Sequence, residues 1–407
     1  MAVLGIDFGT SNTAAGVVQD GKPQLIALEN GADTLPTVIF MDFDSGETLF
    51  GKAAVNAMTE GRDGRFLRAL KSVLGTPLAR ERRQFLNEKL TLLDVIGRFL
   101  REIRLRAEAA TGQTIRHAVS GRPVRFHSAS SERNAQALVD LEHAYALAGF
   151  ASVTFLPEPE AAALATGGTG RLLIVDIGGG TSDFTVCDAD GADTRILASQ
   201  GIRQGGTDFD KVLSLAHAMP LLGYGAKIGN ELGAGSHTAP RALFHDLATW
   251  EKIAFVYAPS LLRDVRRWMQ LAPEPQLFDR LATVLDMHLG HDVAYAVERG
   301  KIEANAEPTG RVVLDVVERG LQALIPADSA AELLADRCDL IADCAAETLA
   351  LAGCTADSID RVVYVGGSSQ MCAIRSRIEA MFPKAVSETS KIFTAVASGL
   401  ALRAALH

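Results

Sequence analysis

Two stretches of the chain repeat one pattern, in which an apolar strand ends in an aspartate and a glycine-containing turn leads into a second strand. The first copy spans residues 3–18 (VLGIDFGTSNTAAGVV), and the second spans residues 172–186 (LLIVDIGGGTSDFTV). Strand–turn–strand patterns of this kind predict β-hairpins. Because the two copies agree in register, they predict two similar lobes that face each other across one nucleotide.

The turn residues of these hairpins indicate what they bind. Only glycine reaches positive φ freely, so Gly178, Gly179 and Gly180 can form a cradle of backbone amides for phosphate oxygens. Asp7 and Asp176 cannot contact phosphate directly without repulsion, but they can do so through a Mg²⁺ ion that keeps its waters. A single copy would fit a turn that merely carries an acid, whereas two copies favour the phosphate interpretation.

Length and composition limit the class of protein. A chain of 407 residues exceeds the size at which one core keeps growing, so more than one lobe is expected. With a net charge of −9 and no basic run, neither nucleic acid nor an anionic membrane is expected as the main partner. We expect a cytoplasmic location, because the sequence begins with a strand and not with a signal peptide, and its five scattered cysteines lack a C-x-x-C pair.

Other segments have open interpretations. Residues 51–112 are expected to be helical, and the glycine-rich residues 221–240 are expected to be irregular. Glu158 follows a short strand and precedes a proline at a predicted helix start, so it is either a helix-dipole acid or an acid directed at the metal site. Lys71 alone has the pattern of a solvated lysine.

Two further glycine pairs are candidates for nucleotide contacts. Gly205, Gly206 and Thr207 open a predicted helix, as a helix cap or as a phosphate or nucleoside contact. Gly366, Gly367 and Ser368 follow a strand without a lysine, which excludes a P-loop and suits a purine or ribose packed flat. Glu298 and Lys301 are spaced i,i+3, which is typical of a solvated ion pair.

At these residues the chain resembles a known family. The stretches beginning at Asp7, Asp176 and Gly366 look like the phosphate-1, phosphate-2 and adenosine motifs of the actin-like ATPase superfamily. Within that superfamily, the chain looks like the seventy-kilodalton heat-shock chaperones (DnaK-like). Residues 158–165 (EPEAAALA) match their connect motif, and residues 205–210 (GGTDFD) match the start of their phosphate-proximal helix.

Three single residues extend this resemblance. Lys71, in the frame LKSVLG, matches the family's catalytic lysine. Pro123 and Arg133 match the proline and arginine of its interlobe switch. The resemblance covers essentially the whole chain, with the motifs in the family's order.

The resemblance implies an α/β, actin-like ATPase fold with two ribonuclease-H-like lobes and a nucleotide cleft between them. Lobe I is expected at residues 1–166, with an insertion subdomain at about 41–111, and lobe II at residues 167–387, with an insertion at about 204–308. Residues 388–407 are expected to form a helix that returns to lobe I. The chain ends where the family's nucleotide-binding domain ends, so no peptide-binding domain is expected, as in the short YegD-like branch.

The resemblance also implies a slow ATPase that uses ATP/ADP and Mg²⁺ and forms no covalent intermediate. Asp7, Asp176 and Glu158 would position Mg²⁺, mostly through water. Lys71 would stabilise the charge that develops on the γ-phosphoryl group, while Thr181 and Asp183 would orient the attacking water. The residues expected to contact nucleotide are Gly9, Thr10, Ser11, Asn12, Gly178, Gly179, Gly180, Gly205, Gly206, Thr207, Glu298, Lys301, Gly366, Gly367, Ser368 and Gln370.

The chain departs from the family pattern at two positions. Gln370 stands where the family has an arginine that stacks on adenine, and Ile302 stands where a second basic residue follows Lys301. These changes weaken the expectation of tight adenine binding and of lid closure.

Three functions fit these features. The leading hypothesis is an ATP-hydrolysing, chaperone-like nucleotide switch that signals to a protein partner or client. The second is a kinase of the same fold acting on a sugar or other small molecule, which would need a catalytic base where the chain has Lys71. The third is a non-catalytic, nucleotide-dependent scaffold or filament subunit.

Overall fold

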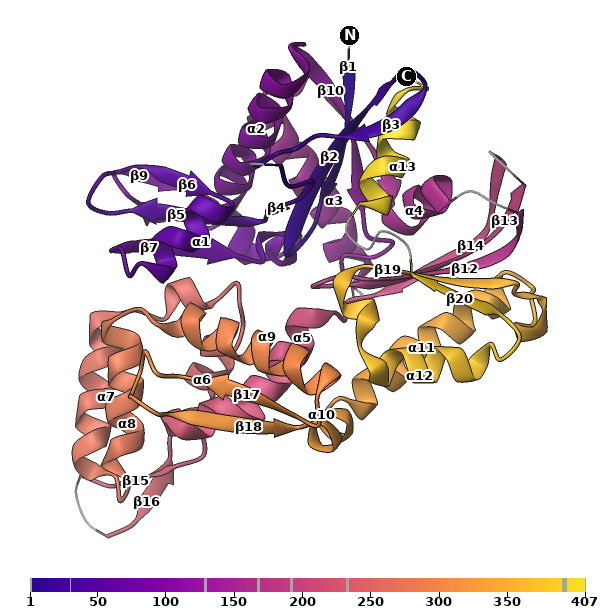
Figure 1. The fold of residues 1–407 in the computed structure, drawn as a ribbon. Helices are drawn as coiled ribbons and strands as arrows, with labels where there is room; N and C mark the ends of the chain where they lie inside the picture. Colours follow the sequence, from indigo (N-terminus) through magenta and orange to yellow (C-terminus); the bar gives the residue numbers. More distant parts are fainter. Residues whose placement is uncertain are drawn as a thin grey trace. The chain divides into compact units, whose positions relative to one another are not determined.

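The computed structural model describes residues 2–29, 31–127, 130–166, 169–190, 193–231, 234–389 and 394–406 (Figure 1). The chain forms two compact units: unit 1 comprises Met1–Gly206 and Arg337–His407, and unit 2 comprises Thr207–Asp336. The expected lobe boundary at residues 166–167 and part of the expected segment 388–407 fall on positions outside the described residues. The division into lobes I and II stays a prediction.

Two central sheets of unit 1 share one strand order. The first runs β3-β2-β1-β10-β11, with β4 paired to β2, and the second runs β14-β13-β12-β19-β20. In each sheet an antiparallel hairpin, β1–β2 or β12–β13, has a parallel neighbour, β10 or β19. Both predicted hairpins are therefore present, at equivalent positions of two similar sheets.

The strands of the two central sheets have the following bounds. They are β1 Ala2–Phe8, β2 Asn12–Gln19, β3 Lys22–Leu25, β4 Leu35–Pro36, β10 Ile115–Arg122, β11 Ser152–Pro157, β12 Thr169–Ile177, β13 Ser182–Asp190, β14 Asp193–Ile202, β19 Arg361–Val365 and β20 Val386–Thr389.

Two helices cover these sheets from within unit 1. Helix α4 (Glu158–Thr166) and helix α13 (Ala395–Ala404) share one buried core with β12 and β19. Figure 1 shows α13, the yellow helix, beside the indigo strands β1, β2 and β3. Small residues permit this packing: a Cβ atom on Gly5 would lie 2.5 Å from the backbone nitrogen of Ala401, and one on Gly399 would lie 1.7 Å from the carbonyl oxygen of Ala161.

The remaining elements of unit 1 surround this centre. They are β5 Val38–Asp42, β6 Thr48–Phe50, α1 Lys52–Thr59, β7 Gly64–Arg68, the 3₁₀ helices η1 Leu70–Val73 and η2 Pro77–Arg80, β8 Arg83–Phe85, β9 Glu88–Leu90, α2 Leu92–Thr111, α3 Ser131–Leu147, α11 Ala335–Leu351 (which begins in unit 2), the 3₁₀ helices η6 Ala356–Ser358 and η7 Gly367–Gln370, and α12 Cys372–Met381.

The prediction that residues 51–112 are helical is partly wrong. Helices α1 and α2 occupy the two ends, but β7, β8, β9 and two 3₁₀ helices lie between them. Strand β7 pairs with β5, an interaction with an earlier segment that local periodicity does not reveal. The start of α2 is locally encoded, because Thr91 and Asp94 form a capping box.

Unit 2 is a smaller body of helices with two short hairpins. Its elements are α5 Gly206–Leu213 (which begins at the last residue of unit 1), the π-helix η3 Ser214–Ala218, the 3₁₀ helix η4 Met219–Leu222, β15 Lys227–Gly229, β16 Ser236–Thr238, α6 Arg241–Leu247, the 3₁₀ helix η5 Ile253–Phe255, α7 Pro259–Leu271, α8 Pro275–Asp286, α9 Gly290–Ala306, β17 Thr309–Val313, β18 Gln322–Pro326 and α10 Ala327–Leu333. Residues 221–240, expected to be irregular, thus include the hairpin β15–β16.

Among the described ranges of the chain, no helix combines the length and the apolar character needed to cross a bilayer.

We expect Gly5→Ala to destabilise unit 1 by about 2–3 kcal/mol, because backbone atoms of α13 cannot yield to the added methyl group. Thermal unfolding measures the effect. Gly353→Ala is the control: that glycine has φ 65° and open space around it, so only its backbone strain, about 1 kcal/mol, is expected. Equal losses for the two variants would contradict the close approach of β1 and α13.

Candidate functional site

The turns of the two hairpins lie against each other within unit 1. A Cβ atom on Gly179 would lie 2.7 Å from Ser11 Oγ, and one on Gly180 would lie 3.1 Å from Thr10 Oγ1. Residues 9–11 connect β1 to β2, and residues 178–181 connect β12 to β13. The side chains of Thr10 and Ser11 in the first turn therefore lie directly against the glycines of the second turn.

Further backbone contacts fix the second turn. The Gly178 N–H donates to Thr181 O at 3.0 Å, which closes the turn, and the Gly206 N–H donates to Gly178 O at 3.0 Å. A Cβ atom on Gly205 would lie 2.6 Å from the Gly179 carbonyl carbon. The glycine pair at the start of α5 thus packs on the glycine triplet, and these predicted contact residues lie together.

Lys71 and Glu158 form a buried ion pair. Lys71 Nζ lies 2.5 Å from Glu158 Oε1, and the two residues are 7% and 8% exposed. Lys71 lies in η1, while Glu158 is the first residue of α4. Gly121 lets the glutamate approach β10, because a Cβ atom there would lie 3.1 Å from Glu158 Cγ. The interpretation of Lys71 as a solvated lysine is wrong, because tertiary packing buries it.

Three aspartates join this pair, and burial raises the pKa of each. Burial and the charge of Glu158 raise the pKa of Asp7 to about 7, against the opposing effect of Lys71. The pKa of Asp176 is raised well above its usual value by burial and by Glu158, Asp183 and Asp7. Burial and Glu158 likewise raise the pKa of Asp183 to about 7, although the Val124 N–H donates to Asp183 Oδ1 at 2.7 Å.

The pKa of Lys71 is raised as well, but for a lysine this shift favours the charged form. Burial alone would lower its pKa, but the charges of Glu158, Asp7 and Asp183 outweigh burial and raise it. Lys71 therefore stays protonated near neutral pH. Four carboxyl groups and one ammonium share this enclosed place, so full ionisation would leave an excess of three negative charges.

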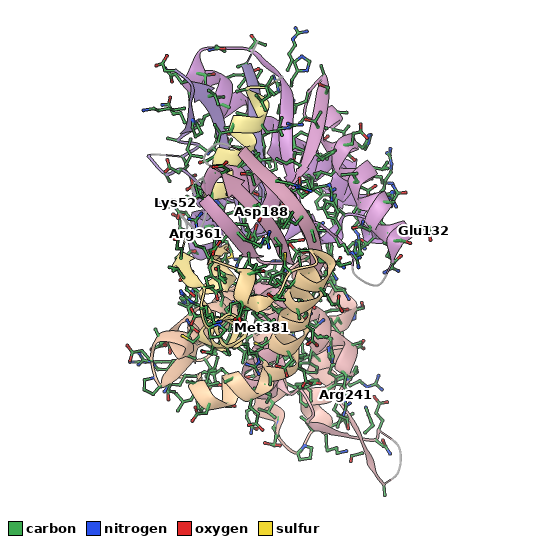
Figure 2. The ribbon with its side chains drawn as sticks, turned by 90° about the vertical axis from the view of Figure 1, so that its right-hand side faces the viewer. Lys52, Glu132, Asp188, Arg241, Arg361 and Met381 are labelled. Atoms are coloured by element: carbon green, nitrogen blue, oxygen red, sulfur yellow. The ribbon has the colours of Figure 1, made fainter. Side chains whose placement is uncertain are left out.

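Charged groups at the other end of β12 behave differently. Arg171 pairs with Asp188 at 2.7 Å, and Arg361 pairs with Glu388 at 3.2 Å. Figure 2 labels Asp188 and Arg361, which lie on the strands that flank β12. Partly exposed pairs of this kind contribute about 0–1 kcal/mol. They contrast with the buried acids at the hairpin end of β12.

The third glycine loop reaches the same end of β12. A Cβ atom on Gly366 would lie 2.9 Å from Asp176 Oδ1, and the φ of Gly366 is 79°. Gly367, Ser368 and Gln370 belong to η7, which follows directly. Gln370 is half-buried, and its Nε2 lies 3.4 Å from Ser369 Oγ. The loop predicted to contact the nucleoside thus begins beside the acid of the second hairpin.

Three predicted contact residues, Thr207, Glu298 and Lys301, lie in unit 2. Lys301 Nζ pairs with Asp210 Oδ1 at 2.6 Å, and Asp210 Oδ2 also accepts the Trp250 Nε1–H at 3.1 Å. Burial raises the pKa of Asp210, and the charge of Lys301 opposes this shift. Glu298, one turn before Lys301 on α9, raises the pKa of Asp210 further. Lys301 is not a solvated lysine, because its side chain is only 10% exposed and pairs with the buried Asp210.

Some residues around the site carry no sequence signal. Ser72 lies beside the second turn, because a Cβ atom on Gly180 would be 3.4 Å from Ser72 Oγ. Val124 follows Pro123 of the predicted interlobe switch and contacts Asp183 through its backbone N–H. Backbone and serine contacts of this kind depend on tertiary packing, so the sequence alone could not identify them.

Comparisons with known proteins identify the family that the chain matches. The family described as Hsp70 protein matches residues 3–220 and 317–407. DnaK chaperone proteins are 29% identical over 215 residues (Metamycoplasma hominis), 32% over 221 (Thermoplasma acidophilum) and 33% over 222 (Nitrosopumilus maritimus). These matches cover 51–52% of this chain and 33–34% of the relatives, so they span about a third of each relative's length.

The repeated sheets and their paired glycine turns define the class as the actin-like ATPase fold. Within that class, the chain belongs to the Hsp70 protein family. Residues 221–316, which include Glu298 and Lys301, lie outside the family match.

We expect Asp7→Asn to stabilise the nucleotide-free protein at about pH 8 but not at about pH 5. The pKa of Asp7 is about 7 in the folded protein, against about 4 when unfolded. The folded state therefore binds the proton more tightly, and the stability that this group contributes falls as pH rises through that interval. Asparagine removes the titration. Differential scanning fluorimetry at both pH values measures the change.

The exposed Asp44→Asn serves as the control, because Asp44 lies in a surface turn. Its effect on the melting temperature is expected to be small and equal at both pH values. The same pH-independent behaviour in Asp7→Asn would contradict a raised pKa.

Proposed function

We propose that the chain binds Mg-ATP and hydrolyses it slowly to ADP and phosphate, as a nucleotide switch of the Hsp70 type. Membership of that family supports a chaperone-type nucleotide-binding domain. The observation that carries the proposal is the enclosed cluster of four carboxyl groups and one ammonium beside two glycine turns. An excess of buried negative charge favours a cation, and the glycine turns favour phosphate.

The donor chemistry fits a magnesium ion. Asp7, Asp176 and Glu158 supply carboxylate oxygens, which Mg²⁺ prefers, and it usually keeps several waters. Over the described ranges, no group of three or more His, Cys, Asp or Glu side chains is arranged so that it could hold a metal ion directly. When bound, the ion would neutralise charge on the phosphate oxygens.

The chain's own residues supply positioning and electrostatic stabilisation. The amides of the two glycine turns bind phosphate oxygens. Lys71, protonated and held by Glu158, stabilises the negative charge that develops on the γ-phosphoryl group. Thr181 and Asp183 orient the attacking water. The raised pKa of Asp183 lets its carboxyl group hold a proton near neutral pH.

The adenosine part of the ligand is assigned to the remaining residues. Gly366, Gly367, Ser368 and Gln370 receive it on unit 1, as the adenosine motif of the family implies. Thr207, Glu298 and Lys301 lie in unit 2, and their expected nucleotide contacts stay a prediction of the family resemblance. Gln370 lacks the stacking surface and charge of the family's arginine, so we propose weaker adenine binding.

A separate protein is proposed to read the nucleotide state. Pro123 and Arg133 are candidates for the relay, and the contact from Val124 to Asp183 supports this role, because it joins the residue after Pro123 to the acid cluster. A cytoplasmic location remains part of this proposal.

Calorimetry with Mg-ADP and Mg-ATP, followed by phosphate release without any added acceptor, tests the proposal. We expect binding of both nucleotides and slow, chelator-sensitive turnover. Turnover that requires a sugar-like acceptor would indicate the kinase instead. ATP-dependent pelleting at micromolar concentration without turnover would indicate the scaffold, and absence of binding would overturn all three.

We expect Lys71→Ala to retain nucleotide binding but to lose about 10²–10³-fold in turnover, the usual loss on removing one electrostatic contact to a transition state. Single-turnover phosphate release and calorimetry separate the two effects. Lys89→Ala, an exposed lysine of β9, is the matched control and should hydrolyse ATP like the wild type. Wild-type turnover in Lys71→Ala would contradict the proposed role of the lysine.

A further inference from the structure

The two residues after the turn that carries Lys71 are each held by a side chain. His127 Nε2 donates to Leu74 O at 2.7 Å, and the next residue, Gly75, donates its N–H to Asp140 Oδ2 at 2.8 Å. A carbonyl oxygen can only accept, so Nε2 of His127 carries the proton. Lys71 lies three residues before Leu74 and four residues before Gly75.

The carboxylate of Asp140 is a buried hydrogen-bond acceptor. It is 2% exposed and lies on α3. Its Oδ1 accepts from Arg80 Nη2 at 2.5 Å and from Gln136 Nε2 at 3.1 Å, while Oδ2 accepts from Gly75. A buried carboxylate requires such donors, because an unpaired one would cost several kcal/mol. Three donors from three segments converge on this one side chain.

Gly75 lets the chain approach α3 closely. Its φ is 76°, and a Cβ atom there would lie 3.0 Å from Ala137 Cβ and 3.0 Å from His127 Nε2. Only glycine combines this backbone conformation with this contact. The turn that follows Lys71 therefore packs closely against α3 and against His127, which precedes that helix.

The other side of the lysine turn is strained. Ala69, directly before η1, has φ 60° and is fully buried. A non-glycine residue keeps this left-handed backbone conformation only where the surrounding structure holds it. The anchors at Leu74 and Gly75 hold the far end of the turn and so help to maintain its conformation.

We propose that Asp140 is a positioning residue, which acts through the Gly75 N–H to hold Lys71 against Glu158. The inference rests on the proposed ATP hydrolysis, to which Asp140 contributes without contacting nucleotide. His127 is the second anchor of the same turn. Loss of Asp140 lets the turn move, and a shift of about 1 Å at a reacting group can lower a rate by about 10²-fold.

Three variants of the full chain test this role. Asp140→Ala removes both functions of the carboxylate, and Asp140→Asn keeps its shape and one acceptor. Arg80→Met removes the ion pair but leaves the acceptor for Gly75. We expect kcat to fall at least about tenfold in Asp140→Ala and about threefold in Asp140→Asn, while Arg80→Met stays within about twofold of the wild type. KM should change less than kcat in every case.

Labelling of Lys71 by acetic anhydride in the nucleotide-free protein, quantified by mass spectrometry, gives a readout independent of hydrolysis. Asp140→Ala should increase labelling severalfold, and Arg80→Met should not, even if both variants melt at lower temperature. Unchanged kcat and labelling in the Asp140 variants would overturn the proposal. So would an equal loss of kcat in Arg80→Met, which would show a role in stability alone.

The two proposals fail in distinguishable ways. If the wild-type protein binds no nucleotide or releases no phosphate, the proposed hydrolysis is wrong, and the labelling experiment alone decides whether Asp140 positions Lys71. Increased labelling in Asp140→Ala but not in Arg80→Met would then still support the positioning role. Unchanged labelling would overturn it.

Discussion

The contact between Lys71 and Glu158 is the interaction on which the rest of the site depends. It places one ammonium among four carboxyl groups, and the charges of these neighbours keep it protonated despite burial. Removing one partner of a buried pair is strongly destabilising, because it leaves an uncompensated charge. Burial and the charge of Glu158 raise the pKa of Asp7, Asp176 and Asp183, so these carboxyl groups hold protons more tightly than exposed ones and the negative charge of the cluster is reduced.

The duplicated sheets explain how distant segments reach this place. Each sheet presents its hairpin turn at an equivalent position, so Asp7 and Asp176 arise from the same structural feature used twice. Helix α4 delivers Glu158 from its first turn, and α13 packs on it through Gly399. The geometry of the acids is thus a property of the core of unit 1 and not of its surface loops.

Sequence reasoning succeeded where a local pattern encodes the structure. The hairpins at residues 3–18 and 172–186 were predictable, because apolar strand residues and glycine turns act over short distances. The strands within residues 51–112 were not, because β7 pairs with the earlier β5. Lys71 illustrates the same limit: its own neighbours indicate solvent exposure, and only the resemblance to a family indicated its role. The contact from Asp140 to the lysine turn had no sequence signal, since the Gly75 amide and the Arg80 side chain lie on other segments.

The distribution of aromatic residues has an optical consequence. The chain contains two tryptophans, Trp250 and Trp268, and both belong to unit 2. Trp250 is 2% exposed and donates to the same Asp210 that holds Lys301, whereas Trp268 packs edge-on against Phe278. Intrinsic indole emission is therefore a label-free signal from the smaller unit, while the body that contains both sheets is spectroscopically silent in that channel.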